Sequence, residues 1–185
     1  KISAVGDIKN NATISAATRV ALVAKSLENG DNALIFSKGD IEIIAENEVK
    51  NSGEILAQGE SQIESQTLKN QSGGLIMAKN EDFAIDGVVT NLGEISALEN
   101  LNILADGLEN NALGLVTAAE VDLKINNQIL NSGEISASDS LEIAIEGEGL
   151  ANNGNIISQN DLTINSQNSA LINEGLIFAT NSSSI

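Results

Sequence analysis

Acidic side chains are the groups in this sequence with the clearest capacity for chemistry. The chain of 185 residues carries 26 Asp and Glu against 9 Lys and Arg, a formal net charge of −17. Four acids stand just before short apolar alternations: Asp40, Glu60, Glu81 and Asp161. Carboxylates from neighbouring segments could bind calcium. However, Asn100, Val121 and Ser140 interrupt the series, and the glycine-and-aspartate nonapeptide of calcium-binding β-rolls is missing. We therefore expect no metal site.

Catalytic side chains are scarce. The sequence has no His and no Cys, which excludes zinc sites built on them, cysteine nucleophiles and histidine bases. Cleavage of an acidic polysaccharide needs a basic residue beside clustered carboxylates, and the chain offers only Arg19 and eight scattered lysines. The run Gly147-Glu148-Gly149 begins like a dinucleotide-binding loop, but Asn152 stands where the third glycine belongs. The sequence predicts a protein that is not an enzyme and holds no cofactor.

Charge and hydropathy exclude two classes of partner. Too few lysines and arginines are present to neutralise nucleic-acid phosphates or an anionic membrane surface. No apolar run approaches the roughly 20 residues that span a bilayer, so we expect no membrane insertion. With 42% hydrophobic residues and a mean hydropathy of +0.02, the chain can still form a core. It starts at Lys1, and we expect residues 1–185 to be one repeat domain cut from a longer protein.

An internal repeat positions these side chains. The repeat is an aliphatic residue, any residue, and then Ala or Ser, and it recurs at intervals of 19–21 residues. Its first members are Ile14, Ile35, Ile55, Ile76, Ile95, Val116, Ile135, Ile156 and Ile177. A second apolar alternation follows most triplets, as at Ile41 and Ile43, and a third precedes an asparagine. The period-2 alternation predicts about three short strands per unit and no helix.

One 20-residue unit cannot fold alone. Its four or five aliphatic side chains contribute about 1.5–3 kcal/mol each, against about 1.5 kcal/mol of ordering entropy for every residue. Stacked units share their inward side chains and hydrogen-bond each strand to its equivalents in the neighbouring coils. The sequence therefore predicts an all-β parallel solenoid of about nine coils.

A longer period of 40 residues lies within the short one. Asn51-Ser52-Gly53-Glu54 recurs as Asn91-Leu92-Gly93-Glu94 and as Asn131-Ser132-Gly133-Glu134, with longer turns between these segments. Short-turn and long-turn coils are therefore expected to alternate. This places the three glutamates two coil heights apart, which weakens their mutual repulsion.

Asparagine and glycine recur at the expected corners. The asparagine series is Asn51, Asn70, Asn91, Asn110, Asn131, Asn152 and Asn173. We interpret it as a structural turn ladder, because asparagine tolerates the left-handed conformation and its amides can hydrogen-bond between coils. A ligand-facing ladder is the alternative. Gly53, Gly93, Gly133, Gly154 and Gly175 are expected to supply a positive φ at a corner.

The middle residue of the triplet should face outward if its neighbours face inward. Five of these residues are large and apolar: Phe36, Leu56, Met77, Ile157 and Phe178. They form a candidate interaction stripe, since an exposed apolar patch often marks an interface. Two alternatives remain open: another segment of the full-length protein covers the stripe, or the triplet is rotated and the stripe lies inside.

The pattern Leu, Asn, Gly, Ile-x-Ala, then Leu-x-Ile is most regular over residues 49–57 and 130–143. It resembles the repeats of filamentous haemagglutinins, exoproteins of the two-partner secretion pathway in Gram-negative bacteria. Their relatives include adhesins and contact-dependent growth-inhibition proteins. The resemblance covers about residues 8–180 and implies a right-handed parallel β-helix. The Asn-Pro-Asn motifs of the secretion domain and the Val-Glu-Asn-Asn boundary of many toxin tips are absent.

The resemblance implies a non-catalytic shaft, secreted to the outer cell surface, that projects a distal adhesive or toxic activity. Its partners would be flanking β-helical coils of the full-length protein and, during export, an outer-membrane two-partner transporter. Alternatively, the segment itself binds a receptor or glycan on a host or bacterial surface, or it is part of a contact-dependent toxin-delivery stick. A polysaccharide-cleaving β-helix enzyme is the remote alternative.

Overall fold

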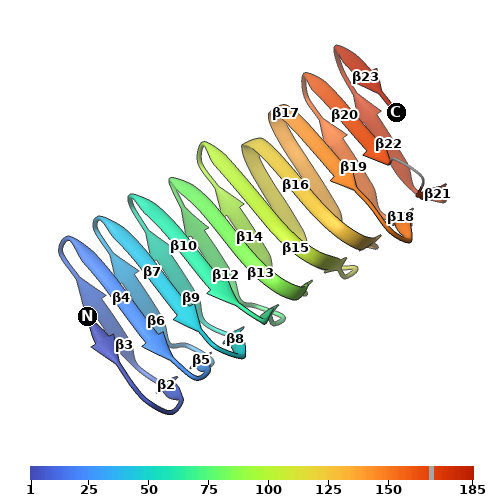
Figure 1. Cartoon of the computed structure of the whole chain (residues 1–185). Coiled ribbons are helices and arrows are strands. Elements are labelled where there is room, and N and C mark those ends of the chain that lie inside the picture. The colour runs from blue at the N-terminus through green and yellow to red at the C-terminus, as the bar shows by residue number, and fades with distance from the viewer. Residues whose placement is uncertain (167–168) are drawn as a thin grey trace.

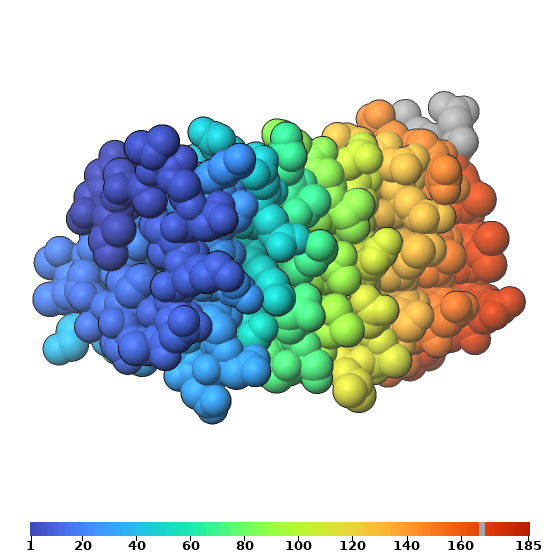
Figure 2. Space-filling view, turned by 90° about the horizontal axis from the view of Figure 1, so that it is seen from below, coloured from blue at the N-terminus to red at the C-terminus, as the bar shows by residue number. Residues whose placement is uncertain are grey.

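The chain winds into a parallel β-solenoid of about nine turns with about 20 residues in each turn. The computed structural model describes residues 1–166 and 169–185, and over these residues it contains strands and no helix. Figure 1 shows the coils stacked in sequence order, with the two termini at opposite ends of the stack. In the space-filling view, successive coils form bands along the molecule (Figure 2). The prediction of an all-β parallel solenoid is therefore confirmed.

The coils contribute strands to three faces, and each strand of an inner coil pairs in parallel with its equivalents in the coils before and after it. Face 1 comprises β1 (Ile2–Ser3), β4 (Arg19–Ala24), β7 (Asp40–Ala45), β10 (Glu60–Ser65), the first parts of β13 (Asn80–Asn91) and β15 (Asn100–Asn110), the middle of β16 (Leu115–Asn131), the last part of β17 (Glu134–Ile145), β20 (Asp161–Ser166) and β23 (Ser182–Ser184).

Faces 2 and 3 complete the coil. Face 2 comprises β2 (Ile8–Asn10), β5 (Leu27–Asn29), β8 (Glu48–Asn51), β11 (Thr67–Asn70), the last parts of β13, β15 and β16, β18 (Gly149–Asn152) and β21 (Ala170–Asn173). Face 3 comprises β3 (Thr13–Ala16), β6 (Leu34–Ser37), β9 (Glu54–Ala57), β12 (Leu75–Ala78), β14 (Glu94–Ala97), the first parts of β16 and β17, β19 (Asn155–Ser158) and β22 (Leu176–Ala179).

The core is a set of aliphatic columns that run along the axis. On face 3 the first triplet residues stack directly on one another, and those of the inner coils are all 0% exposed: Ile35, Ile55, Ile76, Ile95, Val116, Ile135 and Ile156. Successive side chains of a strand point to opposite sides of the sheet, so the residue after each of these aliphatic residues points to solvent. Full burial of each aliphatic side chain contributes about 1.5–3 kcal/mol to stability. A side chain is fully buried only when its own coil has another coil on each side.

Long and short turns alternate between faces 2 and 3 as far as residue 133, as the 40-residue period predicts, and the turns after Asn152 and Asn173 are both short. The long turns at 30–33, 71–74 and 111–114 each close with a backbone hydrogen bond, for example from Gly74 N to Gln71 O at 2.9 Å. The strand register places Glu54 between Leu34 and Leu75, and Glu94 between Leu75 and Leu115. The glutamates of this column are therefore two coils apart, so no two of them lie side by side in adjacent coils.

The expectation of positive φ at the repeated corner glycines is wrong. Among the described residues, positive φ occurs at Asn32, Gly73, Gly147 and Gly149, none of which belongs to the repeated series. Those glycines instead lie against the backbone of the preceding coil: a Cβ on Gly93 would lie 2.2 Å from the carbonyl oxygen of Gly74. The other four repeated glycines show the same approach at 2.1–2.2 Å. Close stacking of the corners, and not backbone conformation, requires glycine.

The described residues contain no helix that is long and apolar enough to cross a membrane.

We expect Gly93→Ala to lower the free energy of unfolding by about 1–3 kcal/mol, because the new methyl group meets backbone that cannot rotate away. Urea denaturation followed by circular dichroism measures the change. Gly6→Ala is the matched control, since a Cβ there meets nothing within 4 Å. Equal midpoints for the two variants would contradict the close-packing explanation.

Candidate functional site

An unbroken ladder of asparagine side chains runs along one corner of the solenoid. The last residue of every face-2 strand is an asparagine, and the ladder contains the seven members of the sequence series preceded by Asn10 and Asn29. Each Nδ2 donates to the Oδ1 of the next asparagine toward the C-terminus, at 2.7–2.9 Å. From Asn10 to Asn152 these side chains are at most 5% exposed, so they cannot form a solvent-facing ligand site.

Each amide also ties face 2 to face 3. Its Nδ2 donates at 3.0–3.1 Å to the first carbonyl oxygen of the face-3 strand in the next coil, as from Asn91 to Leu115. The side chains therefore satisfy backbone groups that the corner would otherwise bury unpaired. Left-handed backbone plays no part, because none of these asparagines has positive φ. That half of the sequence explanation is wrong.

The series from sequence missed Asn10 and Asn29. The signal was present, because Ile8-Lys9-Asn10 and Leu27-Glu28-Asn29 have the same apolar-x-Asn pattern as the later members. A long turn or the lack of a glycine-glutamate pair does not set them apart, because Asn70 and Asn110 of the series share both features with Asn29.

The candidate interaction stripe lies on the outside of face 3. The strand register aligns Phe36, Leu56 and Met77 in successive coils. They are half-buried, and the triplet residues on either side point into the core. The hypothesis that the triplet is rotated and the stripe lies inside is therefore wrong.

The stripe is two patches and not one. Ser96, Thr117 and Ser136 occupy the middle of the row, and the hydroxyl of Ser136 donates to that of Thr117 at 3.2 Å. Ile157 and Phe178 form the second patch near the C-terminal end, where Phe178 is 50% exposed.

The first patch extends beyond the residues found from sequence. Leu34 and Leu75 are half-buried on the same outer surface of face 3, flanking Glu54. A shallow hollow of about 390 Å³ continues the apolar surface between two long turns and is lined partly by Leu75, Leu92, Leu113 and Leu115. These leucines stand at turns and strand starts, so the triplet pattern does not reveal them.

The four acidic residues that precede the apolar alternations do not all lie in one column of face 1. Asp40 and Glu60 do lie in one column, followed by Asn80, Asn100 and Glu120. Glu81 is one residue further along its strand, and its inward position follows from its pairing with Ser61 and Leu101. Within the described ranges, no group of three or more acidic side chains could hold a metal ion.

The neighbouring column of face 1 alternates charge with amide over its middle coils. Glu42, Gln62, Asp82, Asn102 and Asp122 stack in that order. The alternation keeps most carboxylates two coils apart. This limits repulsion on the most acidic surface of a chain at −17.

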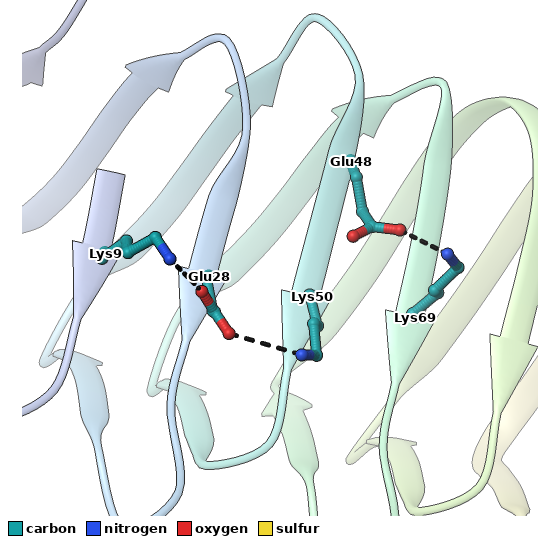
Figure 3. A network of polar contacts seen from close by, with 5 residues as sticks. All are labelled: Lys9, Glu28, Glu48, Lys50 and Lys69. Carbon is teal, nitrogen blue, oxygen red and sulfur yellow. Dashed lines mark hydrogen bonds and ion pairs between the residues drawn. The ribbon is translucent and has the colours of Figure 1, made fainter. Parts of the chain in front are cut away.

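Ion pairs bind neighbouring coils on the outside of face 2 (Figure 3). Lys9 Nζ lies 3.0 Å from Glu28, which also pairs with Lys50 at 3.3 Å, and Lys69 lies 2.6 Å from Glu48. Hydrogen bonds from the two lysines lower the pKa of Glu28, and its carboxylate raises the pKa of Lys9. Because the lysines of Figure 3 are engaged by carboxylates, they do not present an anion-binding surface.

Comparison with known proteins gives no relative: the chain matches no family model, no curated protein and no solved structure.

We expect Asn91→Ala to destabilise the protein by about 2–4 kcal/mol, because the buried Oδ1 of Asn110 and the carbonyl of Leu115 lose a donor. Thermal and urea unfolding measure the loss. Asn102→Ala removes the same side chain from an exposed position of the next coil and serves as the control. A loss as small as that of the control would show that the ladder contributes little.

We expect Phe36→Asp to leave the far-ultraviolet circular dichroism spectrum unchanged, since the side chain lies on the outer surface. If the stripe mediates self-association, the variant should also sediment more slowly at high concentration than the wild type in analytical ultracentrifugation. Loss of the β spectrum would contradict the outward placement.

Proposed function

We propose that this protein is a non-catalytic shaft segment of a secreted haemagglutinin-like exoprotein on the surface of a Gram-negative bacterium. The observation that carries the proposal is the asparagine ladder, which continues through every coil with buried hydrogen bonds of nearly constant length. A stack in which each coil makes the same bonds to the next can act as a rigid spacer. The repeat resemblance supports the choice of family, and the lack of Cys suits a chain exported unfolded.

Stiffness follows from the direction of the bonds. Backbone and asparagine hydrogen bonds both join one coil to the next along the axis, over three faces at once. Bending the stack must stretch whole rows of these bonds together. Such a rod transmits displacement from its base to whatever it carries, which is the mechanical role of a shaft.

The two end coils support the proposal that further coils flank this segment. Asn173 is exposed, and over the described part of the chain its Nδ2 donates within its own turn, to Gly175 O at 3.2 Å. Ile14 and Ile177, the first triplet residues of the two end coils, are only partly buried, whereas their equivalents in the coils between them are 0% exposed. Another coil on each end would bury these side chains in the manner of the inner coils. An outer-membrane transporter of the two-partner type is the proposed export partner.

A second candidate function is recognition of a receptor through the stripe. The apolar patch of Leu34, Phe36, Leu56, Leu75 and Met77 favours it, because a contiguous apolar surface on a chain of this charge often marks an interface. This patch could also contact the target of a toxin-delivery stick.

Binding of the fluorescently labelled protein to host epithelial cells and to Gram-negative bacteria separates the two functions. A shaft should show no saturable binding by flow cytometry when unlabelled protein competes. Saturable binding that Phe36→Asp abolishes would favour the receptor function and overturn the pure shaft. Release of reducing ends or unsaturated uronates from acidic polysaccharides would contradict the non-catalytic proposal.

A further inference from the structure

Glu81 is a carboxyl group in a core column that is aliphatic apart from Glu81 and Ser61. The inward column of face 1 reads Ile41, Ser61, Glu81, Leu101 and Val121 in successive coils. Glu81 is 1% exposed and Ser61 is 2% exposed. Neither carboxyl oxygen of Glu81 has a partner at hydrogen-bond distance and angle. The hydroxyl oxygen of Ser61 has no such partner either. Two polar groups therefore lie next to each other in the core at one level of the stack.

No charge in the core compensates Glu81. The strands packed around it direct only uncharged side chains inward: Ser61, Ile63 and Ser65 from β10, Leu68 from β11, Ile76 and Ala78 from β12, Ile95 and Ala97 from β14, and Leu101, Ile103 and Ala105 from β15. The titratable groups of these strands and of β13 stand at outward positions: Glu60 and Glu64 on β10, Lys69 on β11, Asp82 and Asp86 on β13, Glu94 on β14, and Asp106 and Glu109 on β15.

Solvent reaches the outer side of the strands at this level of the stack. A shallow hollow of about 380 Å³ covers the outside of β10, β13 and β15, and its lining includes Gln62, Asn80 and Asn102. Its lining also includes Ser61 and Glu81, whose strand positions direct their side chains into the core. One layer of backbone therefore separates solvent from the buried carboxyl group, and separation of the strands would admit water to it.

We propose that Glu81 and Ser61 form a proton-sensitive weak point, at which the stack opens first when the pH rises. Each coil of a solenoid is stabilised by its neighbours alone, so a defect confined to one level divides the rod there. Opening would occur between β10, β13 and β15. The blocks on either side, in which the buried residues of the same column are aliphatic, would stay folded.

The direction of the pH effect follows from linkage. Burial raises the pKa of Glu81 well above its ordinary value, and Ser61 opposes that shift to a smaller extent. Below the ordinary pKa of a glutamate, Glu81 is protonated in both the closed and the open stack. Its ionisation then has no effect on the equilibrium between the two forms. Above it, the open form releases the proton while the closed form keeps it, so the opening constant rises about tenfold for each pH unit. The rise stops at the pKa of the closed form.

Hydrogen exchange measured by mass spectrometry at pH 5 and pH 8 tests the proposal, with rates corrected for intrinsic exchange. In the wild type, we expect protection of peptides from β10 and the first part of β13 to fall at least tenfold more than protection of peptides from β17. Glu81→Gln should remove this local difference. Asp82→Asn, which deletes a charge from the adjacent outward position, should retain it.

Equal pH dependence in the wild type and in Glu81→Gln would overturn the proposal, as would an equal fall in β10 and β17. Glu81→Leu is a second variant, because it continues the column with the residue found at Leu101. It should increase protection of β10 at pH 8. A decrease would show that the carboxyl group supports the local structure and would also overturn the proposal.

Discussion

The hydrogen bond from one coil to the next is the interaction on which every other feature of this protein depends. A coil of about 20 residues has almost no bonds of its own, since its strands pair only with those above and below. Pairing in parallel keeps equivalent residues in columns, and the columns decide which side chains are buried. The repeat in the sequence is the consequence. Each coil must present the same cross-section as its neighbours, or the columns break.

Much of this arrangement could be predicted because it follows from periodicity. The triplet placed Ile55 and Ile95 in the core, and the 40-residue period located the alternate turns correctly. Two errors have different causes. A strand has a period of two, so misplacing Glu81 by one residue put it on solvent instead of in the core. The reason for glycine at position 93 could not be read from its own segment, because the constraint is an oxygen atom of Gly74 in the preceding coil.

The outer surfaces could be predicted less well than the core. A column in the core tolerates few residue types, whereas the outside of face 3 accepts Phe36, Ser96 and Thr117 in one row. That freedom is where a repeat protein can acquire specificity without altering its fold. The shaft proposal rests on what the columns have in common, and the receptor alternative rests on what differs between coils on the outside. The two explanations therefore draw on independent parts of the structure.

The asparagine ladder also has an electrical direction of its own. All of its amides donate toward the C-terminal end, so their dipoles add along the axis as peptide dipoles do in an α-helix. The oxygen end lies at Asn10 and the N–H end at Asn173. Lys1, Lys9 and Arg19 lie near the oxygen end, whereas no Lys or Arg follows Lys124 and the last charged residue is Glu174. The charged side chains thus complement the dipole, which makes the two ends electrostatically different.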